Sequence, residues 1–314
     1  ICLAAVSDVL SVPGAMEGRE PMMPIRDVLL ALAVAVVWGI NFVFIRWGVN
    51  EVPPLLLTAL RYVVAAFPAV FFIKRPAVAL SILVGYGIAV GVGQFGLLFT
   101  AIKFGMPAGL ASVVIQLQVF FTIGLAVLFL GERPSGAQLL GALVAFAGIG
   151  VIAAERLGGA ALWPFLMTIA AAVCWGVANL LTKKAGRIDM LGFVVWSSLA
   201  PPIPLYLLSL LFEGPGAVPL ALSQITYVGI GSLLFIGWIS TVFGYGGWSV
   251  LLGRYPASTV APFALLVPVS GIAGATLILG ERITPFELIG SLLVFVGLMT
   301  NVFGPRLLAR QVEA

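Results

Sequence analysis

Two amide side chains occupy matching places in this sequence, each inside a long apolar run. Asn41 follows Trp38 by three residues and Asn179 follows Trp175 by four, so the members of each pair share one face of a helix. An amide offers hydrogen-bond donors and acceptors together, which suits a ligand that carries both a carboxylate and an ammonium group. The competing interpretation is a structural hydrogen bond between helices, because an amide in apolar surroundings is costly without a partner.

Three glutamines in the first half, Gln94, Gln116 and Gln118, lie at a similar depth in their apolar runs. Gln116 and Gln118 are about 200° apart on a helix, so at most one of them faces a central cavity squarely. The corresponding residues of the second half are apolar: Phe243, Leu265 and Val267. We therefore expect the first half to supply more of the polar recognition.

Aromatic rings with polar tips are the next candidates for ligand contact: Tyr86, Tyr245 and Trp248. Packing within the core is the more common role of such rings. Arg61 is the one ionisable residue well inside an apolar run. Its fork of donors could hold a ligand carboxylate, or its long side chain could reach the outer end of its helix.

Membrane helices must position these side chains, because 61% of the residues are apolar, 9% are charged and the mean hydropathy is +1.18. Runs of roughly 20 apolar residues, which can cross a ~30 Å hydrocarbon core, recur throughout the chain. We predict an all-α integral membrane protein whose partner is the lipid bilayer. Its ten transmembrane helices are expected at about 28–46, 54–73, 79–101, 107–130, 136–154, 160–182, 190–212, 223–248, 256–279 and 285–304.

The basic residues indicate topology rather than nucleic-acid binding. A net charge of +4 is weak despite the pI of 9.3, and the basic residues form no continuous patch, so we expect no nucleic-acid partner. With the N-terminus inside, eleven Lys and Arg residues fall in inner segments and four in outer segments. Because basic residues prefer cytoplasmic loops, the distribution predicts that both termini are inside.

The chain contains an internal repeat. An offset of 149 aligns residues 107–148 with residues 256–297 without a gap, and ten of 21 positions are identical over 128–148. The repeated segment includes the turn Gly-Glu-Arg, at 131–133 and again at 280–282. The copies are five spans apart, so they cross in opposite directions. Two five-helix halves in inverted topology are typical of transporters with a site near the midplane; a duplicated structural bundle is the alternative.

This repeat divides the chain into four parts. We expect an N-terminal tail at 1–23, a first repeat at 24–156, a second repeat at 157–306 and a C-terminal tail at 307–314. Residues 1–21 differ in character from the rest, and Met22 or Met23 looks like a natural start, so we assign no function to this segment.

Several segments resemble the EamA-type transporters of the drug/metabolite transporter superfamily. They are VVWGINFVFIRWG at 36–48, PPLLLTALRY at 53–62, FGMPAGLAS at 104–112 and the paired Gly-Glu-Arg hairpins. FPAVFF at 67–72, WSSLAPPIP at 196–204 and LLGRYPASTVAP at 251–262 add similarity to exporters of O-acetylserine and cysteine. The resemblance implies a multi-pass protein of the bacterial inner membrane that exports small amino acids and their metabolites by alternating access.

The distribution of acidic residues limits the transport mechanism. All twelve acids lie in tails, turns or helix ends, and the chain has no histidine. Proton relays normally use intramembrane Asp, Glu or His, so we expect a facilitator or exchanger without tight proton coupling. The Gly-Glu-Arg turns are expected to be architectural, with a local ion pair at the water interface; a gating role for Glu132 and Glu281 is the alternative.

Other functions remain to be considered. Bulky apolar walls would also admit purines, drugs or aromatic amino acids as the small-molecule substrate. A membrane-embedded enzyme acting on lipid would need an acid, a histidine, a cysteine–base pair or a metal site at membrane depth, and the sequence offers none of these. No phosphate-binding loop is present, so ATP-driven pumping is unsupported. We expect no cofactor, no metal and no enzymatic activity.

Overall fold

All regular secondary structure in the computed structural model is helical, across the residues that it describes: 23–156, 161–186 and 188–312, with the backbone alone at 257 and from 305 onward. The predictions for residues 1–22 and for residues 313–314 lie outside this set. Within it, nine helices are long and apolar enough to cross a membrane. A tenth span results if the pair Met190–Ser197 and Pro202–Phe212, bent by 41°, counts as one. The prediction of an all-helical membrane protein with about ten spans is confirmed.

The first half begins with the uninterrupted helix α1 (Ile25–Glu51). The second span is α2 (Pro54–Ala66) with a short 3₁₀ turn, η2 (Ala69–Phe71). The third and fourth spans are each interrupted, and the fifth is continuous. The third span consists of α3 (Leu80–Ile88), η3 (Ala89–Gly96) and α4 (Leu97–Lys103). The fourth consists of α5 (Ala108–Val114), η4 (Ile115–Leu117) and α6 (Gln118–Leu130). The fifth is α7 (Gly136–Arg156).

The second half follows the same plan. It opens with α8 (Leu162–Ala185) and the bent pair α9 (Met190–Ser197) and α10 (Pro202–Phe212), followed by a short helix, α11 (Ala217–Gln224). The interrupted eighth and ninth spans and the last helix complete it. The eighth span consists of α12 (Tyr227–Leu234), η5 (Phe235–Phe243) and α13 (Gly244–Arg254). The ninth consists of α14 (Ala257–Val260), η6 (Ala261–Leu265) and α15 (Leu266–Leu279). The last helix is α16 (Pro285–Val312).

Some boundaries differ from the predicted ones. Helix α1 is longer at both ends than the predicted 28–46, and α16 continues past 304, although its apolar part ends at Gly304. The segment 213–219, predicted as a loop, contains the start of α11. Pro219 is compatible with this helix because it lies in the first turn, where its missing N–H leaves no hydrogen bond unmade.

The interruptions occur at matching places in the two halves. Segments η3 and η5, in the third and eighth spans, are π-helical, whereas η4 and η6, in the fourth and ninth, are 3₁₀. The ninth span contains Pro262 and Pro268, whereas the fourth has Val119 in place of Pro268, so proline alone would interrupt only the ninth span. Both spans change geometry, so proline is not the cause, and packing must impose the interruption.

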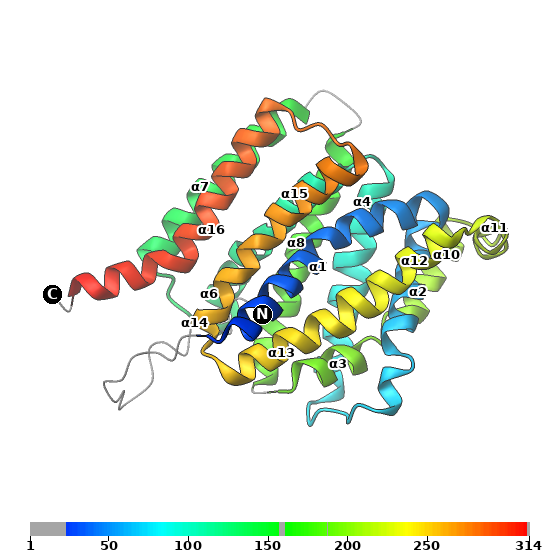
Figure 1. Ribbon diagram of the computed structural model, residues 1–314, viewed down its shortest axis with the longest axis horizontal. Helices are drawn as coiled ribbons and strands as arrows, with labels where there is room; N and C mark the ends of the chain where they lie inside the picture. The colour runs from blue at the N-terminus through cyan, green and yellow to red at the C-terminus, as the bar shows by residue number, and fades with distance from the viewer. Residues whose placement is uncertain (1–22, 157–160, 187, 313–314) are drawn as a thin grey trace.

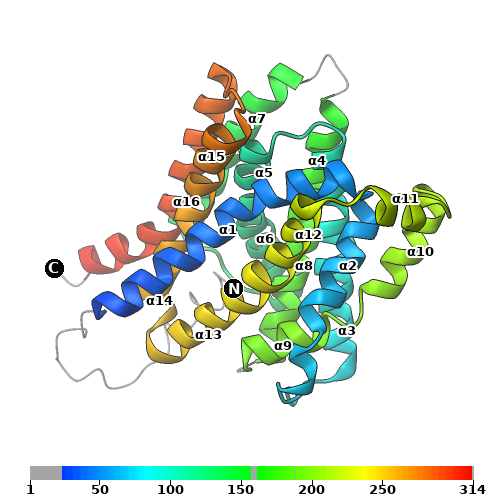
Figure 2. The same ribbon diagram turned by 45° about the vertical axis from the view of Figure 1, so that its right-hand side comes forward.

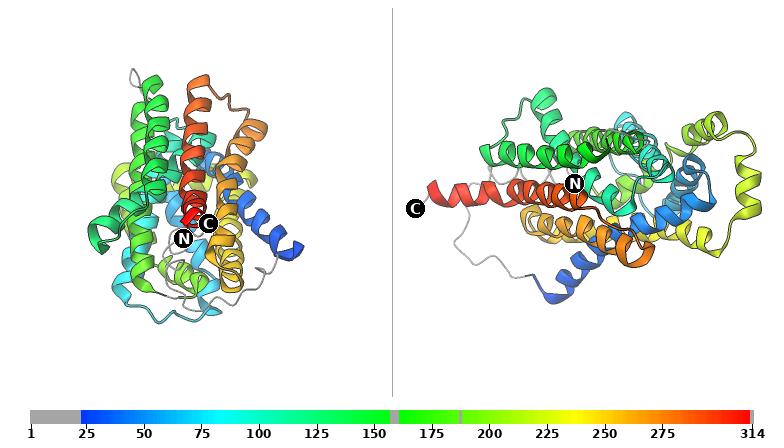
Figure 3. Two further views of the ribbon diagram at one scale, coloured as in Figure 1. Left: turned by 90° about the vertical axis from the view of Figure 1, so that its left-hand side faces the viewer. Right: turned by 90° about the horizontal axis from the view of Figure 1, so that it is seen from above.

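Helices α7 and α16 lie side by side as an antiparallel pair at one flank of the bundle (Figures 1 and 3). Gly148 faces Gly290, and Gly141 faces Gly297, so closely that a Cβ added to Gly148 would lie 2.5 Å from the carbonyl oxygen of Gly290. A Cβ on Gly141 would lie 2.6 Å from the oxygen of Gly297. Small residues bring the two backbones into contact here, as is common between membrane helices.

The bundle has two ends, which we name by residues of α1. The Glu51 end holds the α1–α2 and α15–α16 connections, and the Asp27 end holds the start of α1 and the α13–α14 connection (Figure 2). Each Gly-Glu-Arg turn begins with a glycine in the left-handed region, at φ 68° for Gly131 and 69° for Gly280. Each glycine ends its helix, since other residues rarely adopt this conformation.

The glycine contact between α7 and α16 yields a stability prediction. We expect Gly148→Ala to lower the free energy of unfolding by about 1–3 kcal/mol, because its methyl group would overlap the α16 backbone. Gly150→Ala on the same helix is the matched control, since its methyl group would meet nothing within 4 Å. Thermal unfolding of the two variants in detergent measures the difference. Equal melting temperatures would contradict a close backbone contact.

Candidate functional site

Arg61 lies buried in the bundle, with 2% of its surface exposed. Its Nη2 donates to Thr241 Oγ1 at 3.2 Å, and its guanidinium carbon lies 3.6 Å from the centre of the Phe95 ring. Its Nε and Nη1 have no hydrogen-bond partner among the described residues, and no described acid forms an ion pair with it. The side chain therefore does not reach the helix end, which was one of the two expectations from sequence. It presents two free donors and an uncompensated charge.

Two further polar atoms without partners belong to residues next in sequence to Arg61 and to the Phe95 on which it stacks. The Tyr62 hydroxyl and Gln94 Oε1 are buried and have no hydrogen-bond partner in the described part of the chain. The phenol groups of Tyr86 and Tyr245 lie close to Arg61. A buried polar group is rarely left unpaired unless a ligand or water fills its place, so this cluster has the properties of a binding site.

Two π-helical segments meet at Arg61. Phe95 and Gln94 lie on η3, and Thr241 lies on η5. Thr241 Oγ1 also donates to the carbonyl oxygen of Ile236, five residues earlier, which is a carbonyl that the wide π turn makes accessible. Segments of π-helix are uncommon and frequently lie at functional sites. Tyr62, Phe95 and Thr241 were not among the residues predicted from sequence. Tyr62 is next to Arg61 and Phe95 is next to Gln94, and these positions are the one sequence signal for either residue.

An aromatic cluster adjoins the Arg61 group. The Trp38 ring centre lies 5.4 Å from that of Tyr245 and 5.2 Å from that of Trp248. Trp38 Nε1 donates to the carbonyl oxygen of Ser240 at 2.9 Å, which fixes helix α1 against η5. Trp248 is buried, and its Nε1 has no partner among the described residues. Tyr245 therefore connects the aromatic cluster of Trp38 and Trp248 to the group around Arg61.

The two matching asparagines differ in their environments. Asn179 Nδ2 donates to Gln118 Oε1 at 2.6 Å and to Thr122 Oγ1 at 3.1 Å, so it connects α8 to α6. Asn41 is buried, but its Oδ1 has no partner among the described residues. Asn179 thus makes the structural hydrogen bond that was the competing interpretation for both, whereas Asn41 retains a free acceptor.

Two candidates, Gln116 and Trp175, are not among the contacts of Arg61 in the described residues. Gln116 is buried within η4, and Trp175 packs half-buried against the hydrophobic core. Among the described residues, no group of three His, Cys, Asp or Glu side chains could hold a metal ion.

Charged groups gather at the two ends of the bundle. At the Asp27 end, Asp27 accepts hydrogen bonds from Arg254 at 2.9 Å and from the Tyr255 hydroxyl at 2.6 Å. The hydrogen bond to Asp27 raises the pKa of Tyr255. The expected ion pair within each Gly-Glu-Arg turn does not form in the described residues. Glu132 pairs instead with Lys183 on α8, and Glu281 binds the start of α5, because neighbouring helices offer better-placed donors.

Comparison with known proteins identifies the family to which the chain belongs. The model of the EamA-like transporter family matches the chain twice, at residues 26–154 and 162–303. The chain belongs to this family. It is therefore a transporter. A relative from Salmonella typhimurium named "Probable amino-acid metabolite efflux pump" is 47% identical over 287 residues. The match covers 90% of this chain and 96% of the relative.

Other relatives support the same assignment. An Escherichia coli protein of the same name is 45% identical, with the same coverage of both chains. A Streptantibioticus cattleyicolor protein named "Probable terminal-alkyne amino-acid exporter" is 27% identical and covers 93% of this chain and 98% of its own. A solved structure described only as "Crystal structure of protein" shares the fold, with a TM-score of 0.59 at 22% identity, covering 92% of this chain and 98% of that one.

The hydrogen bond between Gln118 and Asn179 can be tested by a double-mutant cycle. We expect Gln118→Leu and Asn179→Leu to be coupled by about 0.5–2 kcal/mol in unfolding free energy, because either change alone leaves a buried amide short of a partner. Thermal unfolding of both single variants and the double variant in detergent measures the coupling. Additive shifts would contradict a direct bond.

Proposed function

We propose that this transporter exports small amino acids and amino-acid metabolites across the bacterial inner membrane, and that Arg61 binds the substrate carboxylate. The two free donors of a guanidinium match the two oxygens of a carboxylate. A charge buried without a counter-ion is costly, and an anionic substrate group would supply the missing partner. The names of the relatives at 45–47% identity support the choice of amino-acid metabolites.

We assign the rest of the amino acid to neutral groups of the first, third and eighth spans. Gln94 Oε1 and Asn41 Oδ1 are acceptors without partners among the described residues, and an ammonium group is a donor of three hydrogen bonds. The rings of Trp38, Tyr245 and Trp248 would face the side chain of the substrate or its ammonium group. We assign Tyr86 to the wall of this site, and Gln116, Gln118, Trp175 and Asn179 to the part of the pathway formed by spans four and six.

For the transport cycle we propose two five-helix halves, 24–156 and 157–306, in inverted topology with both termini in the cytoplasm. The two matches of the family model support this division. So do the antiparallel contacts of α7 and α16, since 149 residues separate Gly141 from Gly290 and Gly148 from Gly297. A helix that packs against its own repeat in this way is related to it by an approximate two-fold axis. In this orientation the Glu51 end is periplasmic, and exchange of conformations between the halves would give alternating access.

Residues that share the 149-residue offset also make the same local contacts. Ser135 and Gln138 cap the start of α7 reciprocally, each bonding the backbone N–H of the other. Thr284 and Glu287 do the same at the start of α16. The two capping boxes are further support for a duplicated unit.

Arg61→Gln should raise the apparent KM for cysteine or O-acetylserine at least ~10-fold, because it removes the charge-assisted hydrogen bonds to the carboxylate. Arg61→Lys should recover part of the loss, since it restores charge but not the fork. Thr58→Val on the same helix is the control: it removes a buried hydroxyl that bonds the carbonyl oxygen of Pro54 and not Arg61, and it should change KM little. Counterflow into proteoliposomes measures these values.

Competitors define the substrate class in the same assay. Cysteamine, which lacks the carboxylate, should compete poorly with cysteine. Strong inhibition by cysteamine, or normal transport by Arg61→Gln, would contradict the assignment of Arg61. Inhibition by purines, drugs or aromatic amino acids but not by cysteine would favour the alternative substrates considered from sequence.

Transport should proceed without tight proton coupling, because the acidic residues lie at helix ends and in turns and tails. We expect the initial rate of counterflow to be insensitive to a pH gradient imposed across the vesicle membrane. A pH-sensitive dye inside acid-loaded proteoliposomes provides the measurement. Alkalinisation of the lumen in proportion to substrate flux would show that protons move with the substrate.

A further inference from the structure

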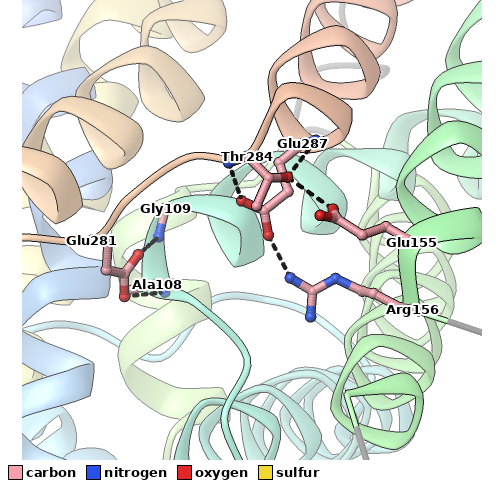
Figure 4. A network of polar contacts seen from close by, with 7 residues as sticks. All are labelled: Ala108, Gly109, Glu155, Arg156, Glu281, Thr284 and Glu287. Atoms are coloured by element: carbon pink, nitrogen blue, oxygen red, sulfur yellow. Dashed lines mark hydrogen bonds and ion pairs between the residues drawn. The ribbon is translucent and has the colours of Figure 1, made fainter. Parts of the chain in front are cut away.

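The carboxylate of Glu281 binds the first residues of a helix from the other half of the chain. Its oxygens accept from the backbone N–H of Ala108 at 2.8 Å and of Gly109 at 3.0 Å (Figure 4). Helix α5, which begins at Ala108, continues through η4 and α6 as one span to Leu130. The N–H groups of a first helical turn have no partner within the helix, so a carboxylate here satisfies them and interacts favourably with the helix dipole.

Two more carboxylates make the same kind of contact at the Glu51 end. Glu213, at the end of α10, accepts from the N–H groups of Leu55 and Leu56 in the first turn of α2, at 2.7 and 3.2 Å. Glu51, at the end of α1, accepts from the N–H of Thr226, which precedes α12, at 2.9 Å. Like Glu281, each joins one half of the chain to the other. These contacts hold the Glu51 end together.

Beside Glu281 the two halves are also joined by a buried ion pair. Arg156 Nη2 on α7 lies 2.5 Å from Glu287 Oε1 on α16, and Thr284 donates to Glu155 at 2.8 Å (Figure 4). Leu110, in the first turn of α5, is 6% exposed and lies with Glu281 around a small cavity. The start of α5 is thus covered in this conformation.

The repeated glutamate, Glu132, has a different kind of partner. Its carboxylate pairs with the ammonium group of Lys183, near the end of α8. An offset of 137 aligns Trp38-Gly39 with Trp175-Gly176, and the same offset aligns Arg46 with Lys183 in the sequence. Arg46 is engaged elsewhere, donating to the carbonyl oxygen of Ile102 at 2.7 Å. One glutamate of the repeat therefore binds a helix start and the other binds a cation.

We propose that Glu281 and Glu132 exchange these roles during the transport cycle. The proposal rests on the inverted halves proposed above. In the conformation described here, Glu281 holds the Glu51 end closed. In the opposite conformation, Glu281 leaves the start of α5 and pairs with Arg46, while Glu132 leaves Lys183 and binds the start of the ninth span, at residues 257 and 258. Glu281 is thus a positioning residue that sets which end of the site is accessible.

Accessibility of a cysteine at position 110 tests the exchange without any substrate. Leu110→Cys is placed in a background in which Cys2 and Cys174 are replaced by Ala, and the solubilised protein reacts with a bulky maleimide in detergent. Glu281→Gln should raise the labelling rate about five- to tenfold, because an amide lacks the charge that stabilises the closed contact. Glu281→Asp should lie between Glu281→Gln and the unchanged residue. Arg282→Gln, a change of exposed charge in the same turn, should have no effect.

A substitution at the far end separates the exchange from local loosening. Lys183→Gln removes the partner that Glu132 has in this conformation, so it should raise labelling at position 110 about two- to threefold, from the opposite end of the bundle. An unchanged rate in Glu281→Gln, with a monodisperse elution profile that shows folded protein, would refute the role of Glu281. A response to Glu281→Gln but none to Lys183→Gln would refute the exchange. Because no substrate is used, either failure is distinct from a failure of amino-acid counterflow.

Discussion

Polar groups in the hydrocarbon core have no water to bind, and this constraint governs how the polar residues of this transporter are placed. Gln118 and Asn179 satisfy it by pairing across two helices, and helix starts at the Glu51 end satisfy it by taking carboxylates from other helices. Arg61 departs from it, with two donors unpaired among the described residues. An anion bound at Arg61 would satisfy these donors, and the proposed substrate site follows from that exception.

Hydropathy and turn residues were sufficient to predict the helices, because a run long enough to cross a bilayer has few alternatives to a helix. They could not predict which neighbour a polar side chain meets. Asn41 and Asn179 are equivalent by sequence, yet one keeps a free acceptor and the other is bonded within the protein. The helices are apolar on nearly every face, so periodicity carries little information about which side of a helix faces the protein and which faces lipid. Arg61, by contrast, could be singled out because charge is rare inside a span.

The changes of helix geometry were the least predictable feature. Prolines account for a change of geometry in the ninth span, but in the described part of the chain the third, fourth and eighth spans change geometry as well, the third and eighth to π-helix. In η5 the Thr241 hydroxyl donates a hydrogen bond to the carbonyl oxygen five residues earlier and accepts one from Arg61. The local backbone and the buried charge therefore depend on each other. Such coupling arises from tertiary contacts between spans distant in sequence, and no local pattern records it.

The glycine contacts of α7 and α16 have a consequence for the origin of the protein. Gly141 and Gly148 recur as Gly290 and Gly297, and each glycine of one copy packs on the non-equivalent glycine of the other. A surface that binds its own duplicate through a two-fold axis is self-complementary, which is the geometry of a symmetric dimer. In the inverted arrangement proposed above, an ancestral five-helix unit would have assembled through this same helix, from two identical chains inserted in opposite directions. Gene fusion would then have converted a dimer interface into an internal one, fixing the stoichiometry and allowing the two copies to diverge.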